Sequence, residues 1–187
     1  ERGELSFRAL ARNPARLENP GGEVARGDVL NRMSLEAACL GMDAVISVLG
    51  TPLTTKPVTL LSEGTRNVVA AMRATGVKRL VCVTGMGAGD SRGHGGFFYD
   101  RLILPLLLRS VYADKDRQEA VVRESDLDWT LVRPAWLSDG PFTGAYRKLT
   151  DLAGQRMTRI SRRDVAHFLV EETLRPAFIR QTVNLSQ

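Results

Sequence analysis

Apolar and polar residues follow one another along this chain in two recurring patterns. Short runs rich in apolar and β-branched side chains alternate with longer segments in which apolar residues recur at helical spacing. The first pattern is typical of strands and the second of amphipathic helices. Their regular alternation predicts an α/β fold, in which helices flank a parallel sheet.

The pattern predicts seven strands and five helices. The predicted strands cover residues 6–12, 23–27, 43–49, 80–84, 129–132, 157–160 and 182–185. The predicted helices are a short one after Asn13-Pro14, one over 34–40 capped by Ser34, and further helices over 58–74, 97–123 (bent or broken at Pro105) and 162–174. Glycine-rich or polar segments at 85–96 and 138–144 are predicted loops. Because neither an internal repeat nor a linker interrupts the pattern, we predict a single domain over residues 1–187.

Composition narrows the class of protein. The 187 residues are 43% hydrophobic and 25% charged, which suits a globular domain and excludes a collagen, a disulfide scaffold and a disordered tail. The apolar run at 102–108 is interrupted by Pro105 and is far shorter than the roughly 20 residues of a membrane-spanning helix. The net charge is +5, but the basic residues are scattered rather than clustered as in nucleic-acid-binding proteins. We therefore expect no membrane and no nucleic-acid partner.

The cysteines indicate a reducing environment. Cys39 and Cys82 each lie inside an apolar run, where a reduced cysteine behaves as a small hydrophobic residue. The chain has no C-x-x-C motif, no cluster of His and Cys and no signal peptide. These features predict a cytoplasmic protein without a metal.

The predicted fold also predicts where a ligand binds. A parallel α/β sheet binds its ligand at the carboxyl ends of the strands, near the point where the strand order reverses. The segments that follow predicted strands are 12–13, 28–29, 49–52, 84–89 and 133–136. Each contains a Gly, a Pro or a short polar side chain, which allows the backbone to approach a ligand closely.

Together with motifs further along the chain, these segments resemble the atypical short-chain dehydrogenase/reductases with an NAD(P)H-binding domain. The resemblance is to the NmrA-like group and, within it, to relatives of biliverdin reductase B and flavin reductases. The matching motifs are ARNP at 11–14, GDV at 27–29, DAVISVLG at 43–50, GTRN at 64–67, VKRL at 77–80, LVRP at 131–134, TGAY at 143–146 and ISRRDVA at 160–166. The resemblance implies a Rossmann-like, doubly wound parallel sheet.

The resemblance also implies a cofactor, NADP in preference to NAD. Arg12, with Arg16 one turn further on, would hold the ribose 2′-phosphate through paired hydrogen bonds, where NAD-selective relatives carry a carboxylate. A solvated loop charge is the alternative interpretation of Arg12. Asp28 and Val29 would flank the adenine, although an Asp after a strand is also a common turn residue.

The remaining cofactor contacts implied by the resemblance lie further along the chain. Leu49, Gly50 and Thr51 would lie over the adenosine and pyrophosphate, Thr84 and Gly85 beside the nicotinamide ribose, Lys115 near them, and Pro134, Ala135 and Trp136 along the nicotinamide.

The beginning of the chain departs from the family pattern. Such proteins open with a strand and a G-x-x-G-x-x-G turn that holds the pyrophosphate, and no such motif precedes Ser6. In the usual strand order 3-2-1-4-5-6 the first strand is central. We therefore expect an N-terminally truncated domain that lacks this strand, with two half-sheets facing a gap.

The catalytic residues depart from the pattern as well. Short-chain dehydrogenases use a Tyr and a Lys four positions apart together with a Ser, whereas here Tyr112 and Lys115 are three apart and Thr84 stands in the Ser position. Alignment on Glu119 puts Lys115 in the Lys position and Val111 in the Tyr position. The catalytic candidates are Thr84, Tyr112 and Lys115, and a Tyr-based proton relay stays open.

From these features we predict an NADPH-dependent oxidoreductase that transfers hydride to a planar acceptor such as a flavin, or to a quinone or small carbonyl compound. A flavin can take its proton from solvent, so the imperfect Tyr/Lys pair matters less for such an acceptor. Trp136 and the aromatic residues at 97–99 are either acceptor surfaces or core packing, and His94 is either a proton donor or a solvated side chain. The alternative function is a non-catalytic NAD(P) sensor or partner-binding protein.

Overall fold

The computed structural model describes residues 6–17, 21–52, 54–94, 101 and 108–187. Its strands are β1 (Arg8–Ala11), β2 (Glu23–Arg26), β3 (Ala44–Ser47), β4 (Arg79–Val83), β5 (Asp128–Pro134), β6 (Trp136–Ser138), β7 (Arg147–Leu149), β8 (Arg159–Ser161) and β9 (Gln181–Ser186). Its α-helices are α1 (Arg32–Cys39), α2 (Leu60–Thr75), α3 (Arg109–Arg123) and α4 (Arg162–Leu174). Short 3-10 helices are η1 (Pro14–Arg16) and η2 (Gly89–Ser91). The alternation of strands and helices confirms the predicted α/β class.

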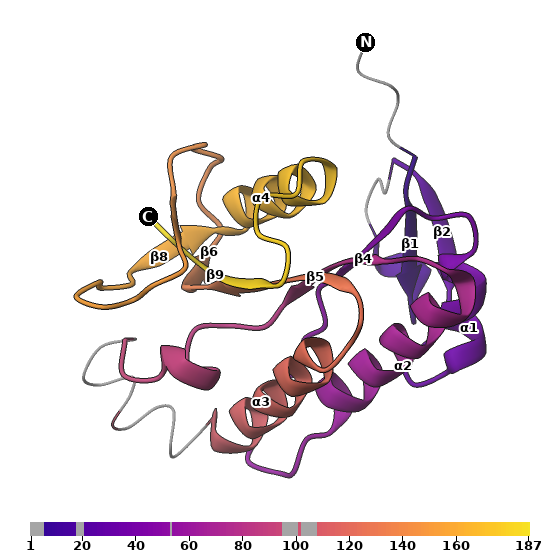
Figure 1. Ribbon diagram of the computed structural model, residues 1–187, viewed down its shortest axis with the longest axis horizontal. Helices are drawn as coiled ribbons and strands as arrows, with labels where there is room; N and C mark the ends of the chain where they lie inside the picture. The colour runs from indigo at the N-terminus through magenta and orange to yellow at the C-terminus, as the bar shows by residue number, and fades with distance from the viewer. Residues whose placement is uncertain (1–5, 18–20, 53, 95–100, 102–107) are drawn as a thin grey trace.

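The strands form one large sheet and two small ones. Strands β3, β4, β5, β9 and β7 make a five-stranded sheet in the order β3-β4-β5-β9-β7, which is parallel except for β7. Strands β1 and β2 pair in parallel with each other, and β6 pairs with β8. Figure 1 shows β1 and β2 beside α1 at one end of the molecule. Within the described part of the chain no strand joins β1 or β2 to β3, so the small sheet and the large sheet share no ladder of hydrogen bonds.

Helices cover both faces of the large sheet, as the doubly wound prediction requires. Along β4, Leu80 and Cys82 lie in one apolar cluster with residues of α1, α2 and α3. The residue between them, Val81, lies in a second cluster with Phe168 and Leu169 of α4. Figure 1 shows the same division, with α4 on one side of the strands and α2 and α3 on the other. Because successive side chains of a strand point to opposite faces, a strand covered on both faces is apolar throughout.

The cap of α1 and the bounds of several elements differ from those predicted from the sequence. The cap of α1 is Asn31, whose side chain accepts a hydrogen bond from the Ser34 N–H at 3.3 Å, rather than Ser34. The hydroxyl of Ser34 instead donates to the carbonyl of Asn31 at 2.8 Å. Strand β5 continues through Pro134, beyond its predicted end, because Pro134 pairs with Leu185 of β9. Most of the predicted helical stretch at 97–108 lies outside the described residues, and α3 begins at Arg109.

The sequence analysis missed β6 and β7 and expected an entirely parallel sheet. Both strands are three residues long, and most of their residues are exposed or half-buried. Neither segment shows the apolar run or the regular alternation that marks a strand in a sequence. The antiparallel pairing of β7 with β9 therefore had no signal in the sequence.

Three further observations concern the cysteines, membrane spans and metal sites. Both cysteines are free and buried, and burial raises the pKa of the Cys82 thiol to about 12. In the described ranges no helix is long and apolar enough to cross a membrane. The same residues contain no group of His, Cys, Asp and Glu side chains able to hold a metal ion.

Candidate cofactor and catalytic site

The carboxyl ends of β4 and β5 are joined by backbone hydrogen bonds that continue past the strands. The N–H of Thr84 donates to the carbonyl of Val132 at 2.8 Å, and the N–H of Met86 donates to that of Pro134 at 3.2 Å. Because β4 and β5 are parallel, both segments emerge at the same edge of the sheet. This edge is where the sequence placed the catalytic candidates.

Tyr112 and Lys115 of α3 reach the same point on this edge, beside Gly85. A methyl group built at Gly85 would lie 3.6 Å from the Tyr112 hydroxyl oxygen and 3.6 Å from Lys115 Nζ. Residues three apart on a helix share a face, which explains why both side chains reach this point. Lys115 Nζ also donates a hydrogen bond to the carbonyl of Thr84. The structure therefore brings all three catalytic candidates together, whereas Val111 lies in an apolar cluster with Val58 and Leu61.

The environment of Lys115 changes its acid–base behaviour. Burial lowers the pKa of Lys115, while Cys82, Glu119 and Asp114 act in the opposite direction without cancelling the effect. A lowered pKa means that the ammonium group gives up its proton at lower pH than an ordinary lysine does. Below that pKa the ammonium group of Lys115 carries a positive charge near the Tyr112 hydroxyl.

A buried ion pair that the sequence analysis did not propose supports this edge. Arg133 Nε donates to Glu119 Oε1 at 2.8 Å, and a second guanidinium nitrogen donates to Oε2 at 2.6 Å. The Thr84 hydroxyl donates to the same Oε1 at 2.8 Å. Arg133 is 1% exposed and Glu119 is 3% exposed, so both charges are removed from water. A charged residue within the apolar strand LVRP was the available signal for this pair, because an arginine there needs a buried partner.

The charges of this pair sustain each other. Burial acts to raise the pKa of Glu119, but the hydrogen bonds and charge of Arg133 outweigh it and hold that pKa below its ordinary value. Burial likewise acts to lower the pKa of Arg133, and Glu119 with Asp90 raises it instead. Both side chains therefore stay ionised, and Thr84 is held by an ionised carboxylate.

A second group of predicted residues meets at the ends of β2 and β3. A methyl group built at Gly64 of α2 would lie 2.9 Å from both methyl carbons of Val29 and 3.2 Å from a methyl carbon of Leu49. Asn67 Nδ2 also donates to the carbonyl of Val29 at 3.1 Å. Only a residue without a side chain lets α2 approach these two strand ends so closely. Val29 and Leu49 are thus brought together against α2.

The other predicted cofactor residues differ in exposure. Asp28 is half-buried, and its Oδ1 accepts from the Leu30 N–H at 2.9 Å, so part of its carboxylate already caps a turn. Arg12 directly follows β1 and Arg16 ends η1, and both side chains are exposed with no ion pair to another described residue. The rest are the exposed Gly50 and Trp136, the half-buried Thr51, and the buried Pro134 and Ala135. Ala135 belongs to an apolar cluster with Met86 and Leu152, so it contributes to the wall behind the site rather than to its surface.

Comparison with known proteins gives the family. A model described as NAD(P)H-binding matches residues 1–176 of the chain. The chain belongs to the NAD(P)H-binding family. This observation agrees with the α/β Rossmann-like arrangement of strands and helices described above.

Relatives of this NAD(P)H-binding protein are found among curated sequences and solved structures. The chain is 33% identical to the UPF0659 protein YMR090W of Saccharomyces cerevisiae over 66% of its own length, a match that spans 52% of the yeast protein. It is 28% identical to the Uncharacterized sugar epimerase YhfK of Bacillus subtilis, over 88% of the chain and 74% of that protein. A solved structure of ChuY, described as an anaerobilin reductase from Escherichia coli, superposes with a TM-score of 0.78 at 24% identity, covering 97% of this chain and 84% of that one. The last likeness concerns the fold.

The residues described here fit an NAD(P)H cofactor at both of its ends. At one end the half-buried Val29 and Leu49 offer apolar neighbours for an adenine ring, and Arg12 is exposed directly after β1. At the other end the side-chain-free position of Gly85 leaves room beside Tyr112 and Lys115. The candidate cofactor residues therefore lie in two separate places, one at the ends of β2 and β3 and one at the ends of β4 and β5.

Proposed function

We propose that this NAD(P)H-binding protein is an NADPH-dependent reductase that transfers hydride to a planar acceptor, such as a flavin, a quinone or a small carbonyl compound. The observation that carries the proposal is the convergence of Thr84, Tyr112 and Lys115 beside Gly85. NADPH, when bound, supplies the hydride, and the protein has to hold the acceptor and provide or exclude a proton.

The preference for NADPH rests on Arg12 and Arg16. Both guanidinium groups are exposed and make no ion pair with a described carboxylate, so they are available to an anionic group. A guanidinium binds a phosphate through paired, charge-assisted hydrogen bonds. NADPH carries a 2′-phosphate that can accept them, whereas NADH does not.

The proposed roles at the β4–β5 edge follow from the contacts there. Tyr112 is the proton donor for a carbonyl acceptor, and the ammonium group of Lys115, which reaches the same point beside Gly85, attracts the negative charge that develops as the phenol gives up its proton. Thr84 is held by Glu119 with its hydroxyl hydrogen directed to the carboxylate, so its oxygen can accept a hydrogen bond but its proton is engaged. Thr84 is therefore a positioning residue rather than a proton donor.

A second candidate function is a non-catalytic NAD(P) sensor. The engagement of the Thr84 hydroxyl with Glu119 favours it, because the serine hydroxyl at this position of short-chain dehydrogenases orients the substrate. Under either function the proposed ligands are small molecules, and a cytoplasmic location stays a prediction from the sequence.

One substitution distinguishes the two functions. We expect Tyr112→Phe to lower turnover with an aldehyde acceptor by about 100-fold, because general-acid catalysis contributes at least that much. Turnover with a flavin should change little, since reduced flavin takes its proton from solvent, and the affinity for NADPH should stay the same. Steady-state assays of NADPH oxidation, together with fluorescence titration of NADPH, measure these quantities.

The matched control is Tyr146→Phe, which removes a phenol that lies 2.9 Å from His167 Nδ1 and belongs to none of the proposed contacts. It should leave both activities unchanged. Tight NADPH binding by the wild-type protein without oxidation by any flavin, quinone or aldehyde would reject the reductase and support the sensor.

A further inference from the structure

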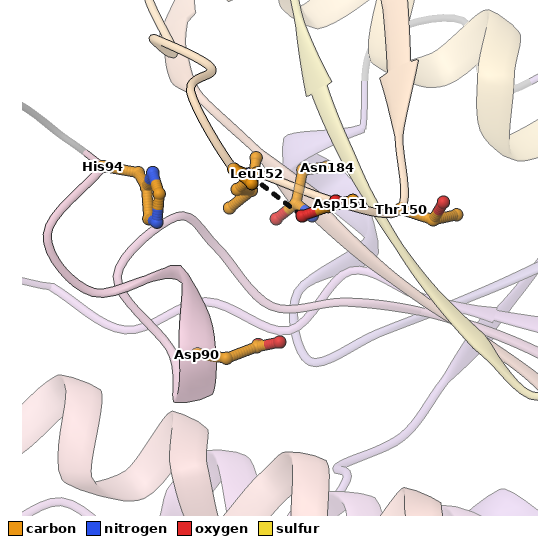
Figure 2. Close-up of a pocket in the computed structure, with 7 residues that line it drawn as sticks. Asp90, His94, Thr150, Asp151, Leu152 and Asn184 are labelled. Atoms are coloured by element: carbon orange, nitrogen blue, oxygen red, sulfur yellow. Dashed lines mark hydrogen bonds between the residues drawn. The ribbon is translucent and has the colours of Figure 1, made fainter.

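A pocket beside the loop that follows β4 lies apart from Thr84, Tyr112 and Lys115, none of which lines it. It has a volume of about 320 Å³ and is lined by Asp90, His94, residues 150–153 and Asn184 of β9. Figure 2 shows Asp90 and His94 on one side of this space and Asp151, Leu152 and Asn184 on the other. Asp90 also accepts a hydrogen bond from Arg133, so the pocket adjoins the ion pair that holds Thr84. Its volume is within the range of small-molecule sites.

Asn184 presents an unmatched hydrogen-bond acceptor in the wall of this pocket. The residue is 3% exposed, and its Nδ2 donates to the carbonyl of Leu149 at 3.1 Å. Its Oδ1 is buried and accepts no hydrogen bond from another described residue. Reversing the amide would place two oxygens against each other at Leu149, so the orientation is fixed. A buried acceptor without a donor is rare in folded proteins, and a ligand that carries an N–H or O–H group would satisfy it.

The charge of the pocket is negative. Asp90 and Asp151 are its charged carboxyl side chains, and no Lys or Arg is among the described residues that line it. Arg133 pairs with Asp90 and lowers its pKa, so Asp90 stays ionised. Asp151 accepts from the Ala153 N–H at 2.9 Å and has no ion pair with a described cation. An anionic ligand would therefore approach an uncompensated carboxylate.

The floor of the pocket is apolar. Leu152 lines the pocket and belongs to a buried cluster with Met86, Ala135 and Met157. An apolar floor with a few fixed polar groups at its rim is typical of sites for ring-shaped organic ligands.

We propose that this pocket, named here the Asn184 pocket, is the acceptor site of the reductase and selects uncharged, planar acceptors that carry N–H or O–H donors, while disfavouring anionic ones. That the bound ligand accepts hydride rests on the proposed function. The selectivity of the pocket does not, because binding measurements alone can test it. Asn184 Oδ1 accepts a hydrogen bond from a ring N–H of the ligand, and Asp151 repels a ligand phosphate or carboxylate.

Two matched pairs of flavins test the selectivity by binding alone. Riboflavin and FMN differ by a phosphate, and lumiflavin can be compared with lumiflavin methylated at its ring N–H. Quenching of flavin fluorescence by the full chain gives each affinity. At low salt we expect riboflavin to bind about tenfold more tightly than FMN, and methylation to weaken lumiflavin about tenfold, since a tenfold change corresponds to one charge-assisted or buried hydrogen-bond difference.

The variant Asp151→Asn tests the source of the charge selectivity. An asparagine keeps the acceptor for the Ala153 N–H and removes the charge, so the riboflavin-to-FMN ratio should fall about threefold or more while riboflavin affinity stays the same. The control Asp43→Asn removes an exposed carboxylate that precedes β3, at the opposite edge of the sheet, and should leave the ratio unchanged.

The outcomes separate this inference from the proposed function. Equal affinities within either flavin pair, a ratio that Asp151→Asn does not change, or no flavin binding would overturn the Asn184 pocket as proposed. The expected affinities without NADPH-dependent reduction of riboflavin, of a quinone or of an aldehyde would leave the selectivity standing and reject the reductase. If riboflavin and FMN bound with equal affinity and both were reduced, the selectivity of the Asn184 pocket would be rejected and the reductase function supported.

Discussion

The two parallel sheets that carry the candidate site are built differently. In the β1–β2 sheet no residue is fully buried, whereas β4 and β5 are buried along almost their whole length. The small sheet contacts α1 through a few groups, such as the hydrogen bond of 3.1 Å from the Arg8 guanidinium to the carbonyl of Ala38 and the packing of Leu10 against the cluster that contains Leu35. The large sheet contains a buried ion pair at its functional edge. The proposed cofactor selectivity thus lies on the lightly packed part and the proposed chemistry on the densely packed part.

This difference teaches where stability and function are coupled. A side chain on the small sheet, such as Arg12, contacts mainly solvent, so its replacement should change ligand binding without changing folding. A side chain at the β4–β5 edge holds both the fold and the site, because the same hydrogen bonds serve both. Three substitutions test this comparison. Those at Glu119 and Asp164 act on the free energy of unfolding, and the one at Arg12 acts on cofactor binding.

The largest effect is expected at Glu119. Glu119→Gln removes the carboxylate that accepts from Arg133 and Thr84, and leaves the buried guanidinium with Asp90 alone. Removing one partner of a buried ion pair costs about 3–5 kcal/mol, and the remaining contact to Asp90 places our expectation near the lower limit. Urea denaturation followed by circular dichroism measures the free energy of unfolding.

The control for this prediction is Glu36→Gln, which breaks the exposed pair between Arg32 and Glu36. Exposed pairs of this spacing contribute about 0.5 kcal/mol or less, so the control should unfold almost as the wild-type protein does. A loss of similar size in both variants would show that the β4–β5 edge is not held by its ion pair.

A smaller effect, on binding rather than folding, is expected at Arg12. Arg12→Glu places a carboxylate where a 2′-phosphate would bind, and we expect the affinity for NADPH to fall about tenfold or more relative to NADH, a change of about 1.4 kcal/mol. The free energy of unfolding should change by less than about 0.5 kcal/mol, because the side chain is exposed. Fluorescence titration with both nucleotides measures the ratio.

Arg159→Glu is the matched control, since Arg159 is an exposed arginine of β8 with the same change of charge. It should leave the NADPH-to-NADH ratio unaltered. If Arg12→Glu altered neither affinity, the solvated-charge interpretation of Arg12 would be correct.

The difference in burial between elements also explains which of them the sequence pattern predicted. The helical spacing of apolar residues predicted α2, and runs of β-branched and apolar residues predicted β4 and β5. These patterns are strong because the elements are buried on one or both faces. The pattern failed for β6 and β7, where three-residue strands on the surface need no apolar run. It also misplaced the cap of α1, since Asn31 and Ser34 are both good capping residues and only the backbone decides between them.

For the candidate site, the sequence predicted which residues lie at strand ends but not what they contact. The convergence of Tyr112 with Lys115 at Gly85 depends on the distance between α3 and β4, which no local pattern encodes. The sequence gives Glu119 no role beyond its place in the alignment, although its carboxylate accepts hydrogen bonds from Thr84 and Arg133. Long-range pairs such as this one join elements far apart in sequence, so they require the fold before they can be assigned.

The effect that depends most on pH is expected at Asp164, which joins two of the sequence motifs on the large-sheet side. Its carboxylate accepts from the N–H groups of Thr143 and Gly144 at 2.9 and 3.0 Å and from the Ser161 hydroxyl at 2.8 Å. Burial acts to raise the pKa of Asp164, but these hydrogen bonds outweigh it and lower the pKa to about 2. A carboxyl group whose pKa is lower in the folded state stabilises the protein above its unfolded-state pKa, and this contribution is lost as the pH falls toward the folded-state value. Wild-type protein should therefore be more stable than Asp164→Asn near neutral pH, and the difference in free energy of unfolding should shrink as the pH falls from about 4 to about 2. A difference that stays constant over this range, in urea denaturation at each pH, would contradict the prediction and show that Asp164 contributes through shape rather than charge.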